Sequence, residues 1–522
     1  MSTSASASVA DADPLLDGLN PQQRTAVLSR AQALLIVAGA GSGKTAVLTR
    51  RVARLIRDRE LWPSQILAIT FTNKAAAEMR ERVELLVGRE AAQGMWISTF
   101  HSACVRILRR EAEQFGFGAA FTIYDSADSR ALIKRLVKEM QADTMGFTVS
   151  AVAGKISRLK NELVDAEGYS RQLNPNDPTE VMFLELYRRY TAELRRANAF
   201  DFDDLIAQTV YLFRAFPHVA ALYQRRFRHI LIDEYQDTNH AQYALIRELT
   251  RPVEPVHVPA DTRVELDASG GIRGANLTVV GDSDQSIYAF RGADIRNIVE
   301  FERDFPGAEV VLLEQNYRST QTILDAANAV IANNFDRIAK NLFTAVGAGE
   351  KIVGFTGYTQ HDEAQFVADE IARLREQGMP YSEMAVFYRT NAQTRALEEI
   401  LIRSGVPYRV LGGTKFYERA EIKDLMAYLI AVANPADGLA MRRILNTPKR
   451  GIGPATETAL AAHADELGGT MHDALRDAAA LGLGPKVTAA ILDLSGLLDE
   501  LGDGVATMAV PDVLTTILER TT

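Results

Sequence analysis

The chain has 522 residues, a formal net charge of −9 and a single cysteine, Cys104. This length predicts roughly three to four domains, and one cysteine excludes a disulfide framework. The acidic balance argues against nonspecific adhesion to nucleic acid but leaves local basic patches open. Residues 1–13 lack the basic start and apolar core of a signal peptide, and no later stretch has the length and apolarity of a membrane span. We therefore expect a soluble cytoplasmic protein with no membrane partner and a disordered tail over residues 1–18.

A glycine-rich turn separates the first apolar run, residues 34–37, from a predicted helix. Its free N–H groups and the positive end of the helix would face the same anion. Lys44 would reach the β- and γ-phosphates, and the Thr45 hydroxyl would ligate Mg²⁺. The pattern predicts a nucleotide site, although Ala38 stands where the strict pattern has Gly. The turn consists of Ala38, Gly39, Ala40, Gly41, Ser42, Gly43, Lys44 and Thr45.

Short β-branched runs then alternate with long helical stretches, which predicts parallel sheets covered on both faces. The sequence between about residues 100 and 200 is almost wholly helical, which indicates an insertion in the first sheet domain. Residues 252–274 are rich in Pro, Gly, Asp and Val and predict a surface loop. A second sheet domain is expected from about residue 310, and a second helical insertion after residue 450. The clearest strands after the first are residues 66–71, 229–235, 277–282 and 384–390.

An acidic motif, DEYQDT, follows the predicted strand that begins at His229. Open α/β sheets bind ligands at the carboxyl ends of their strands, so this motif should meet the glycine-rich turn. Asp233 would hold Mg²⁺, and Glu234 would act as general base for the attacking water. The two motifs together predict ATP hydrolysis rather than a nonhydrolysing nucleotide switch.

Six motifs, DEYQDT among them, occur in order, and together they resemble those of the Rep/UvrD/PcrA family of superfamily 1 DNA helicases. The resemblance covers nearly all of the chain after residue 18 and is strongest to bacterial PcrA/UvrD-type enzymes. These motifs are TFTNKAAAEM (70–79), TFHS (99–102), DFDDL (201–205), DEYQDT (233–238), GDSDQSIYAFRGAD (281–294) and LEQNYRST (313–320).

This resemblance implies an α/β fold with two RecA-like P-loop parallel-sheet domains, each carrying an α-helical insertion. The first RecA-like domain would take residues 19–105 and 200–309, with its insertion at 106–199. The second would begin with residues 310–411, and its insertion would start at 412–522. After residue 453 the family's His and Ala-Lys-Gly motif and its later Thr-Arg-Ala motif are absent from the sequence, so we expect the second domain to be incomplete.

The resemblance also assigns roles in the ATP site. Gln23 would read the adenine edge, and Tyr317 would stack on the base. Gln285 would sense the γ-phosphate, and Arg318 would stabilise charge on it from across the cleft. The implied catalytic set is Glu234, Lys44, Gln285 and Arg318, with ATP and Mg²⁺ as cofactors.

A DNA track of stacking aromatics and polar groups is implied as well. His101 could instead be a metal ligand or a base, but no Cys or His stands at a suitable spacing, so no metal other than Mg²⁺ is expected. The aromatic candidates are Phe71, Tyr288 and Phe290, and the polar ones are Thr99, His101, Arg291, Arg389 and Asn391.

The predicted function is an ATP-dependent 3′-to-5′ DNA helicase and translocase acting in DNA repair or replication restart. Its partners would be single-stranded DNA, 3′-tailed duplexes and DNA-repair proteins. Because of the absent motifs, these residues alone are expected to bind ATP but to unwind no duplex. Two alternatives remain open: a non-motor fragment that binds nucleotide and single strands without coupling them, and a metabolic P-loop kinase whose turnover is indifferent to DNA.

Overall fold

The computed structural model describes residues 13–58, 60–260, 266–334, 338–411, 419–504 and 507–521. The chain divides into two compact units. The first consists of Met1–Gly347 with Asp424–Thr522, and the second is Ala348–Lys423. Residues 1–12 of the expected tail lie outside the described residues. Residues 13–18 do not match that expectation, because Leu15 is buried and Arg50 donates to the carbonyl of Asp17 at 2.5 Å.

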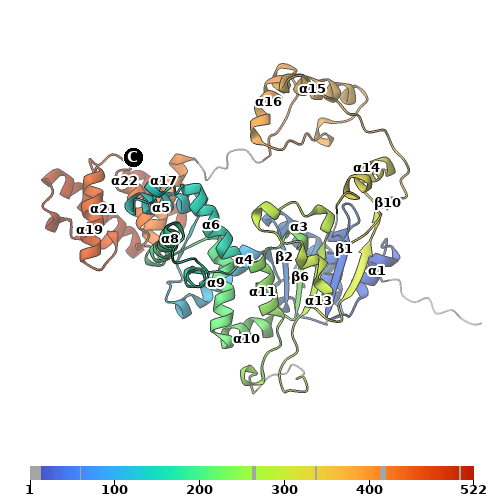
Figure 1. Cartoon of the computed structure of the whole chain (residues 1–522), viewed down its shortest axis with the longest axis horizontal. Coiled ribbons are helices and arrows are strands. Elements are labelled where there is room, and N and C mark those ends of the chain that lie inside the picture. Colours follow the sequence, from blue (N-terminus) through green and yellow to red (C-terminus); the bar gives the residue numbers. More distant parts are fainter. Residues whose placement is uncertain are drawn as a thin grey trace, which may run out of the picture. The chain divides into compact units, whose positions relative to one another are not determined.

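A parallel sheet forms the core of the first sheet domain, within the first unit (Figure 1). The strand order is β3-β2-β6-β7-β1-β8, and every neighbouring pair is parallel. In β1, which lies next to the edge strand β8, Ile36 is opposite Val280 on one side and Val311 on the other. The described strands of this sheet are β1 (Ala33–Ala38), β2 (Ile66–Thr70), β3 (Trp96–Thr99), β6 (His229–Ile232), β7 (Asn276–Gly281) and β8 (Glu309–Leu313).

Helices cover both faces of this sheet, as its continuous apolar strands predict. Leu34 and Ile36 face one apolar cluster, and Leu35 and Val37 face the other. The first cluster is completed by α1 (Pro21–Leu28), α2 (Lys44–Arg57) and α3 (Asn73–Val87). The second is completed by α4 (Phe100–Glu111), α9 (Phe202–Ala215), α10 (Pro217–Arg226) and α11 (His240–Thr250), with α12 (Arg296–Val299) and α13 (Phe301–Asp304) at its edge. The predicted α/β class with a parallel sheet is thus confirmed.

The edge strand β8 corrects one expected boundary. Residues 310–313 were assigned to the second sheet domain, but β8 pairs with β1 and belongs to the first sheet. The chain continues into a short parallel pair, β9 (Gln315–Asn316) with β10 (Phe343–Thr344), joined through α14 (Gln321–Ile331). Residues up to Gly347 therefore stay with the first unit.

The first insertion is helical and has its own apolar core. Leu136, Ile156 and Tyr187 are among the residues at its centre. The sequence did not predict the short parallel pair β4 (Thr122–Tyr124) and β5 (Ala199–Asp201), which connects this core to the sheet domain. The helices are α5 (Ser126–Glu139), α6 (Val149–Asn161), α7 (Ala166–Ser170) and α8 (Pro178–Arg196).

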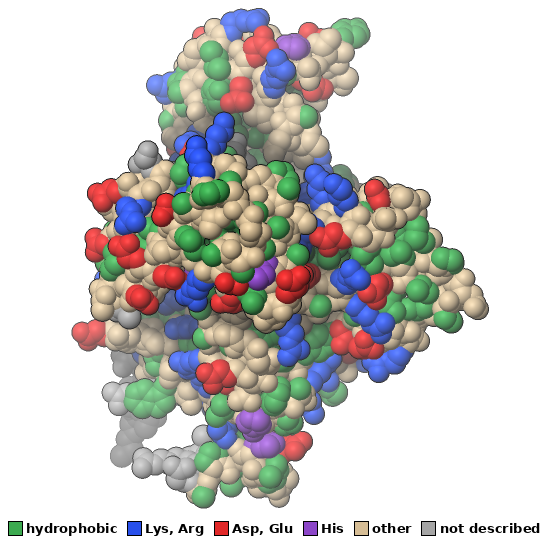
Figure 2. Space-filling model, turned by 90° about the vertical axis from the view of Figure 1, so that its left-hand side faces the viewer, with side chains coloured by type: hydrophobic (Ala, Val, Ile, Leu, Met, Phe, Trp, Pro, Cys, Tyr) green, Lys and Arg blue, Asp and Glu red, His purple; other side chains and the backbone are tan. Residues whose placement is uncertain are grey.

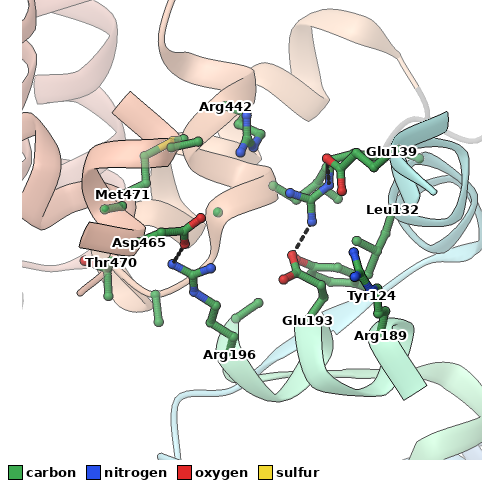
Figure 3. Close-up of a pocket in the computed structure, with 18 of the residues that line it drawn as sticks. Tyr124, Leu132, Glu139, Arg189, Glu193, Arg196, Arg442, Asp465, Thr470 and Met471 are labelled. Atoms are coloured by element: carbon green, nitrogen blue, oxygen red, sulfur yellow. Dashed lines mark hydrogen bonds and ion pairs between the residues drawn. The ribbon is translucent and has the colours of Figure 1, made fainter. Parts of the chain in front are cut away.

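The last region of the chain is also helical and contacts the first insertion. Asn434 donates to the carbonyls of Ala197 and Asn198 at 2.9 and 3.1 Å. A cavity of about 440 Å³ lies at this junction, where Arg196 of α8 pairs with Asp465 of α19 (Figure 3). The helices are α17 (Ala420–Ala433), α18 (Gly438–Ile444), α19 (Pro454–Glu466), α20 (Met471–Arg476), α21 (Pro485–Gly504) and α22 (Val510–Thr521).

The second unit contains two helices that pack together, α15 (Gln360–Glu376) and α16 (Thr394–Arg403), with Ala368 and Ile400 in their interface. The expected strand over residues 384–390 is wrong for this structure, which has no strand there. A parallel strand needs a paired neighbour to satisfy its backbone groups, and the described residues of this unit include none.

The predicted loop over residues 252–274 is closed at its base by an antiparallel bridge between Val253 and Ile272.

Among the described residues no single helix has the length and apolarity needed to span a membrane, and α9 and α10 reach that threshold only as a bent pair.

On the face shown in Figure 2, basic and acidic side chains are interspersed rather than separated.

Candidate functional site

The glycine-rich turn connects the end of β1 to the start of α2, as predicted. Gly41 and Gly43 have φ values of +72° and +85°, a region that favours glycine. Gly43 is the N-cap of α2 and supplies no side-chain cap, so the first amides of the helix are open to an anion. A Cβ on Gly39 would lie 2.3 Å from the Leu342 side chain, so a larger residue here would require that side chain to shift.

An ion pair joins the glycine-rich turn to the acidic motif. Lys44 Nζ lies 3.0 Å from Glu234 Oε2 and 3.2 Å from Oε1. Glu234 has a φ of +49°, which costs a non-glycine residue about 1–2 kcal/mol. Such strained residues cluster at active sites. The strain and the ion pair both support the predicted importance of this carboxylate.

Two partly buried carboxylates, Asp233 and Asp237, lie near Glu234. Burial and the nearby Glu234 charge raise the pKa of Asp233 to about 6. Burial, with a smaller contribution from Glu234, also raises the pKa of Asp237 to about 6, and its Oδ1 has no hydrogen-bond partner among the described residues. Thr45 lies in the first turn of α2. Asp233 and Thr45 would hold Mg²⁺, which neutralises phosphate charge when it is bound.

Gln285 is connected to Glu234 by hydrogen bonds through Gln236 and Asp282. Gln236 Nε2 donates to Glu234 Oε2 at 2.9 Å, and the Asp282 amide donates to Gln236 Oε1 at 2.9 Å. Gln285 Nε2 in turn donates to Asp282 Oδ2 at 2.5 Å. The structure thus brings Gln285 into the same polar network as Lys44 and Glu234. Its role as γ-phosphate sensor stays a prediction.

Gln23 and Tyr317 both lie next to the glycine-rich turn. Gln23 is buried, its Nε2 donates to the Ser42 carbonyl at 2.9 Å, and its Oε1 accepts from the Asn20 amide at 3.0 Å. Both ends of the Gln23 carboxamide are therefore engaged within the protein in this structure. The Tyr317 hydroxyl accepts from Asn20 Nδ2 at 3.0 Å, and half of the residue is exposed. Their roles toward adenine stay predictions.

Arg318 lies next to the turn, and Asn316 holds this segment in place. Asn316 Nδ2 donates to the Ala40 carbonyl at 2.5 Å, and its Oδ1 accepts from the Arg318 amide at 2.8 Å. A Cβ on Gly41 would lie 2.7 Å from Arg318 Cβ. The resemblance assigns roles to Tyr317 and Arg318 but not to Asn316, and the position of Asn316 directly before them in the same motif is the signal in the sequence that indicates it.

The three predicted stacking aromatics form one cluster. Phe71 and Tyr288 are stacked with ring centroids 5.1 Å apart, and Tyr288 lies 5.9 Å from Phe290. The guanidinium of Arg291 lies 5.1 Å from the Tyr288 ring and 5.6 Å from the Phe290 ring. Phe290 is 70% exposed, so its face is open to a partner. Aromatic faces beside a cation suit the bases and phosphates of a single strand.

The polar residues predicted to contact DNA differ in their burial and in their contacts. Thr99 caps α4, because its Oγ1 accepts from the Ser102 amide at 3.3 Å. Burial lowers the pKa of His101 to about 4. The His101 ring lies 4.6 Å from the ring of Phe202, an exposed aromatic residue of the DFDDL motif that was not among the predicted site residues. Arg389 and Asn391 are exposed residues of the second unit. Contact of these groups with DNA stays a prediction.

Comparisons with known proteins agree with this geometry. The UvrD/REP helicase N-terminal domain matches residues 19–306, and the UvrD-like helicase C-terminal domain matches residues 311–481. The chain is 52% identical to the ATP-dependent DNA helicase UvrD1 of Mycobacterium tuberculosis over 98% of its own length and 65% of the relative's. It is 45% identical to the ATP-dependent DNA helicase PcrA of Staphylococcus aureus over 97% of this chain and 66% of the relative. The chain thus spans slightly less than two thirds of these relatives, and it belongs to the UvrD/REP helicase family.

Proposed function

We propose that this chain carries the ATP-hydrolysing site of a 3′-to-5′ DNA helicase and translocase. The observation that carries this proposal is the layout of residues 282–290. Asp282 is linked through Gln236 to Glu234, whereas Tyr288 and Phe290 lie in the exposed aromatic cluster. A structural change at the phosphate site would therefore be transmitted over only a few residues to reach the proposed single-strand track. Proximity of this kind suits a motor that couples hydrolysis to its grip on DNA.

In the proposed reaction the glycine-rich turn, Thr45 and Asp233 bind MgATP, and Lys44 contacts its phosphates. Because Lys44 is paired with Glu234 in this structure, phosphate binding competes for the lysine and releases the carboxylate. Glu234 then takes a proton from the attacking water, while Arg318 stabilises charge on the γ-phosphoryl group. Loss of the γ-phosphate ends the interaction assigned to Gln285.

The proposed substrates are single-stranded DNA and 3′-tailed duplexes, and the proposed setting is cytoplasmic DNA repair or replication restart, with repair proteins as partners. The aromatic cluster supports a sequence-independent grip, since every base has a face for stacking. The relatives UvrD1 and PcrA are named as ATP-dependent DNA helicases. The Lys44–Glu234 arrangement supports transfer of that chemistry to this chain.

The test is steady-state phosphate release with and without oligo-dT, beside strand displacement on 3′-tailed and 5′-tailed duplexes. We expect single strands to stimulate turnover, and any displacement to require a 3′ tail. A Glu234→Gln variant is the control for contaminating ATPases. Turnover that is indifferent to DNA would contradict a motor, and tight binding of nucleotide and DNA without mutual influence would favour the non-motor fragment.

A further inference from the structure

Lys340 is a buried lysine that none of the assigned roles uses. Its side chain is 1% exposed, and its ammonium forms an ion pair with Asp282 Oδ1 and another, at 2.5 Å, with Asp284 Oδ2. Burying a lysine is unfavourable unless its charge is paired, and here two carboxylates surround it. Both aspartates belong to the GDSDQ segment that contains Gln285.

Asp282 is the central residue of this cluster. One of its carboxylate oxygens accepts from Lys340 and from the Asp284 amide at 3.0 Å. The other oxygen accepts from Gln285 Nε2 at 2.5 Å, and the Asp282 amide donates to Gln236. The side chains of Asp282 and Asp284 are 2% and 13% exposed. Without the ammonium, two buried like charges would repel each other, and Asp282 could no longer hold Gln285 in the same orientation.

The Lys340 ammonium also connects two regions of the chain that match different domains of the family. Asp282 and Gln285 lie in the region matched by the N-terminal domain, residues 19–306, whereas Lys340 lies in the region matched by the C-terminal domain, residues 311–481. Movement of the segment that carries Lys340 would therefore change the position of Asp282 directly. Among the described residues, Lys340 is the one ion-pair partner of Asp282.

We propose that Lys340 is a positioning residue: it fixes Asp282, and through Asp282 the Gln285 amide, so that the site distinguishes ATP from ADP. This inference rests on the proposed function, because it uses the γ-phosphate role of Gln285. In this proposal Lys340 makes no contact with the nucleotide, because its ammonium is buried between two carboxylates. Its loss should reduce the preference for a triphosphate over a diphosphate and leave unchanged the phosphate-binding turn, which both nucleotides use.

The experiment compares the affinities of the 522-residue chain for Mg-ADP and for the nonhydrolysable analogue Mg-AMPPNP. Lys340→Met removes the charge but keeps the length and apolar stem. We expect its ADP affinity to stay within about twofold of the wild type and its AMPPNP affinity to fall roughly fivefold or more, the usual lower range of coupling between sites. Lys340→Arg, which keeps the charge, should recover most of the AMPPNP affinity.

Lys160→Met is the matched control, since Lys160 is another buried lysine, paired with Asp201 at 2.6 Å and Asp204 at 2.8 Å where the first insertion joins the sheet domain. It should lose thermal stability without changing the ratio of the two affinities. A Gln285→Ala variant should show the same loss as Lys340→Met, and the double variant should lose no more than either alone, because both act through one contact.

Equal weakening of ADP and AMPPNP in Lys340→Met, or additive losses in the double variant, would overturn the positioning role. If Lys340→Met does not fold, Asp282→Asn replaces it, since it removes the acceptor charge and should give the same selective loss. A wild-type chain that binds neither nucleotide would overturn the proposed function together with this inference. A wild-type preference for AMPPNP that survives in every variant would overturn the inference alone.

Discussion

Lys44 and Glu234 are held together by an ion pair in which the lysine ammonium contacts both carboxylate oxygens, at 3.0 and 3.2 Å. The pair connects the phosphate-binding turn to the proposed general base. In the proposed reaction, phosphate displaces a carboxylate from Lys44, and this displacement frees Glu234 for the attacking water. Glu234 has a strained backbone, with φ at +49°, and this conformation persists only because the surrounding structure holds it.

Replacing Glu234 with Gln should separate nucleotide binding from hydrolysis. The amide keeps the shape but cannot activate water, so we expect DNA-stimulated turnover to fall by roughly 10²–10⁴-fold. Nucleotide affinity should be unchanged or tighter, because Lys44 no longer has a competing carboxylate. Phosphate release and the affinity for AMPPNP measure the two effects, with exposed Glu113→Gln as the matched control. Wild-type turnover in the Glu234 variant would exclude this residue as the base.

Replacing Lys44 with Ala should weaken binding and catalysis together. The lost ammonium contacts phosphate in the ground state and in the transition state, so both the affinity and the turnover number should fall. The substitution also leaves Glu234 with Gln236 as its remaining side-chain partner among the contacts described. Calorimetric titration with Mg-ADP and Mg-AMPPNP is the measurement. Loss of turnover with full affinity for both nucleotides would contradict the assigned phosphate contact.

The sequence was sufficient to predict the parts of the site that depend on local motifs. The glycines at 41 and 43 need positive φ, and the strand endings place Asp233 and Glu234 at one edge of the sheet. The β8 boundary was not predictable in this way, because an apolar run shows that a strand forms but not which neighbour it pairs with. The same limit explains the error at residues 384–390, an apolar run that has no paired neighbour in the described structure.

Two contacts of the site were not predicted from the sequence for a different reason. Lys340 and Asn316 lie far along the chain from the groups they contact, 58 residues for Lys340 to Asp282 and 276 for Asn316 to Ala40. A lysine in a polar stretch is usually a solvent-exposed residue, and nothing local indicates that Lys340 is buried. Only the tertiary fold brings these side chains to the glycine-rich turn and to the GDSDQ segment.

Truncating Phe290 to Ala should weaken single-strand binding by roughly 1–3 kcal/mol, the usual contribution of one stacked base. Phe290 is the better test than Tyr288, because Tyr288 also packs on Phe71 and its loss would disturb the protein itself. The weakening should be similar for dT and dC homopolymers in fluorescence anisotropy. Trp62→Ala, which removes an exposed aromatic outside the cluster, is the control. Unchanged affinity in the Phe290 variant would exclude stacking at this site.

The elevated pKa of Asp233 predicts a pH dependence of Mg²⁺ binding. The pKa of Asp233 is raised from 3.8 to about 6, so the Asp233 carboxylate becomes protonated as the pH falls through 6. The protonated form must lose this proton before it can bind a cation. The affinity for Mg-AMPPNP should therefore be full at pH 7.5 and about tenfold weaker at pH 5.

The matched variant for this prediction is Asp233→Asn, which cannot titrate. The nucleotide's own phosphate titration occurs with both proteins, so the ratio of wild-type to variant affinity isolates the contribution of Asp233. That ratio should rise with pH between 5 and 7 and then level off, and it should lose its slope when EDTA replaces Mg²⁺. A ratio that is flat with Mg²⁺ present would mean that Asp233 does not hold the cation, and a ratio that falls with rising pH would mean that its protonated form is the one that binds.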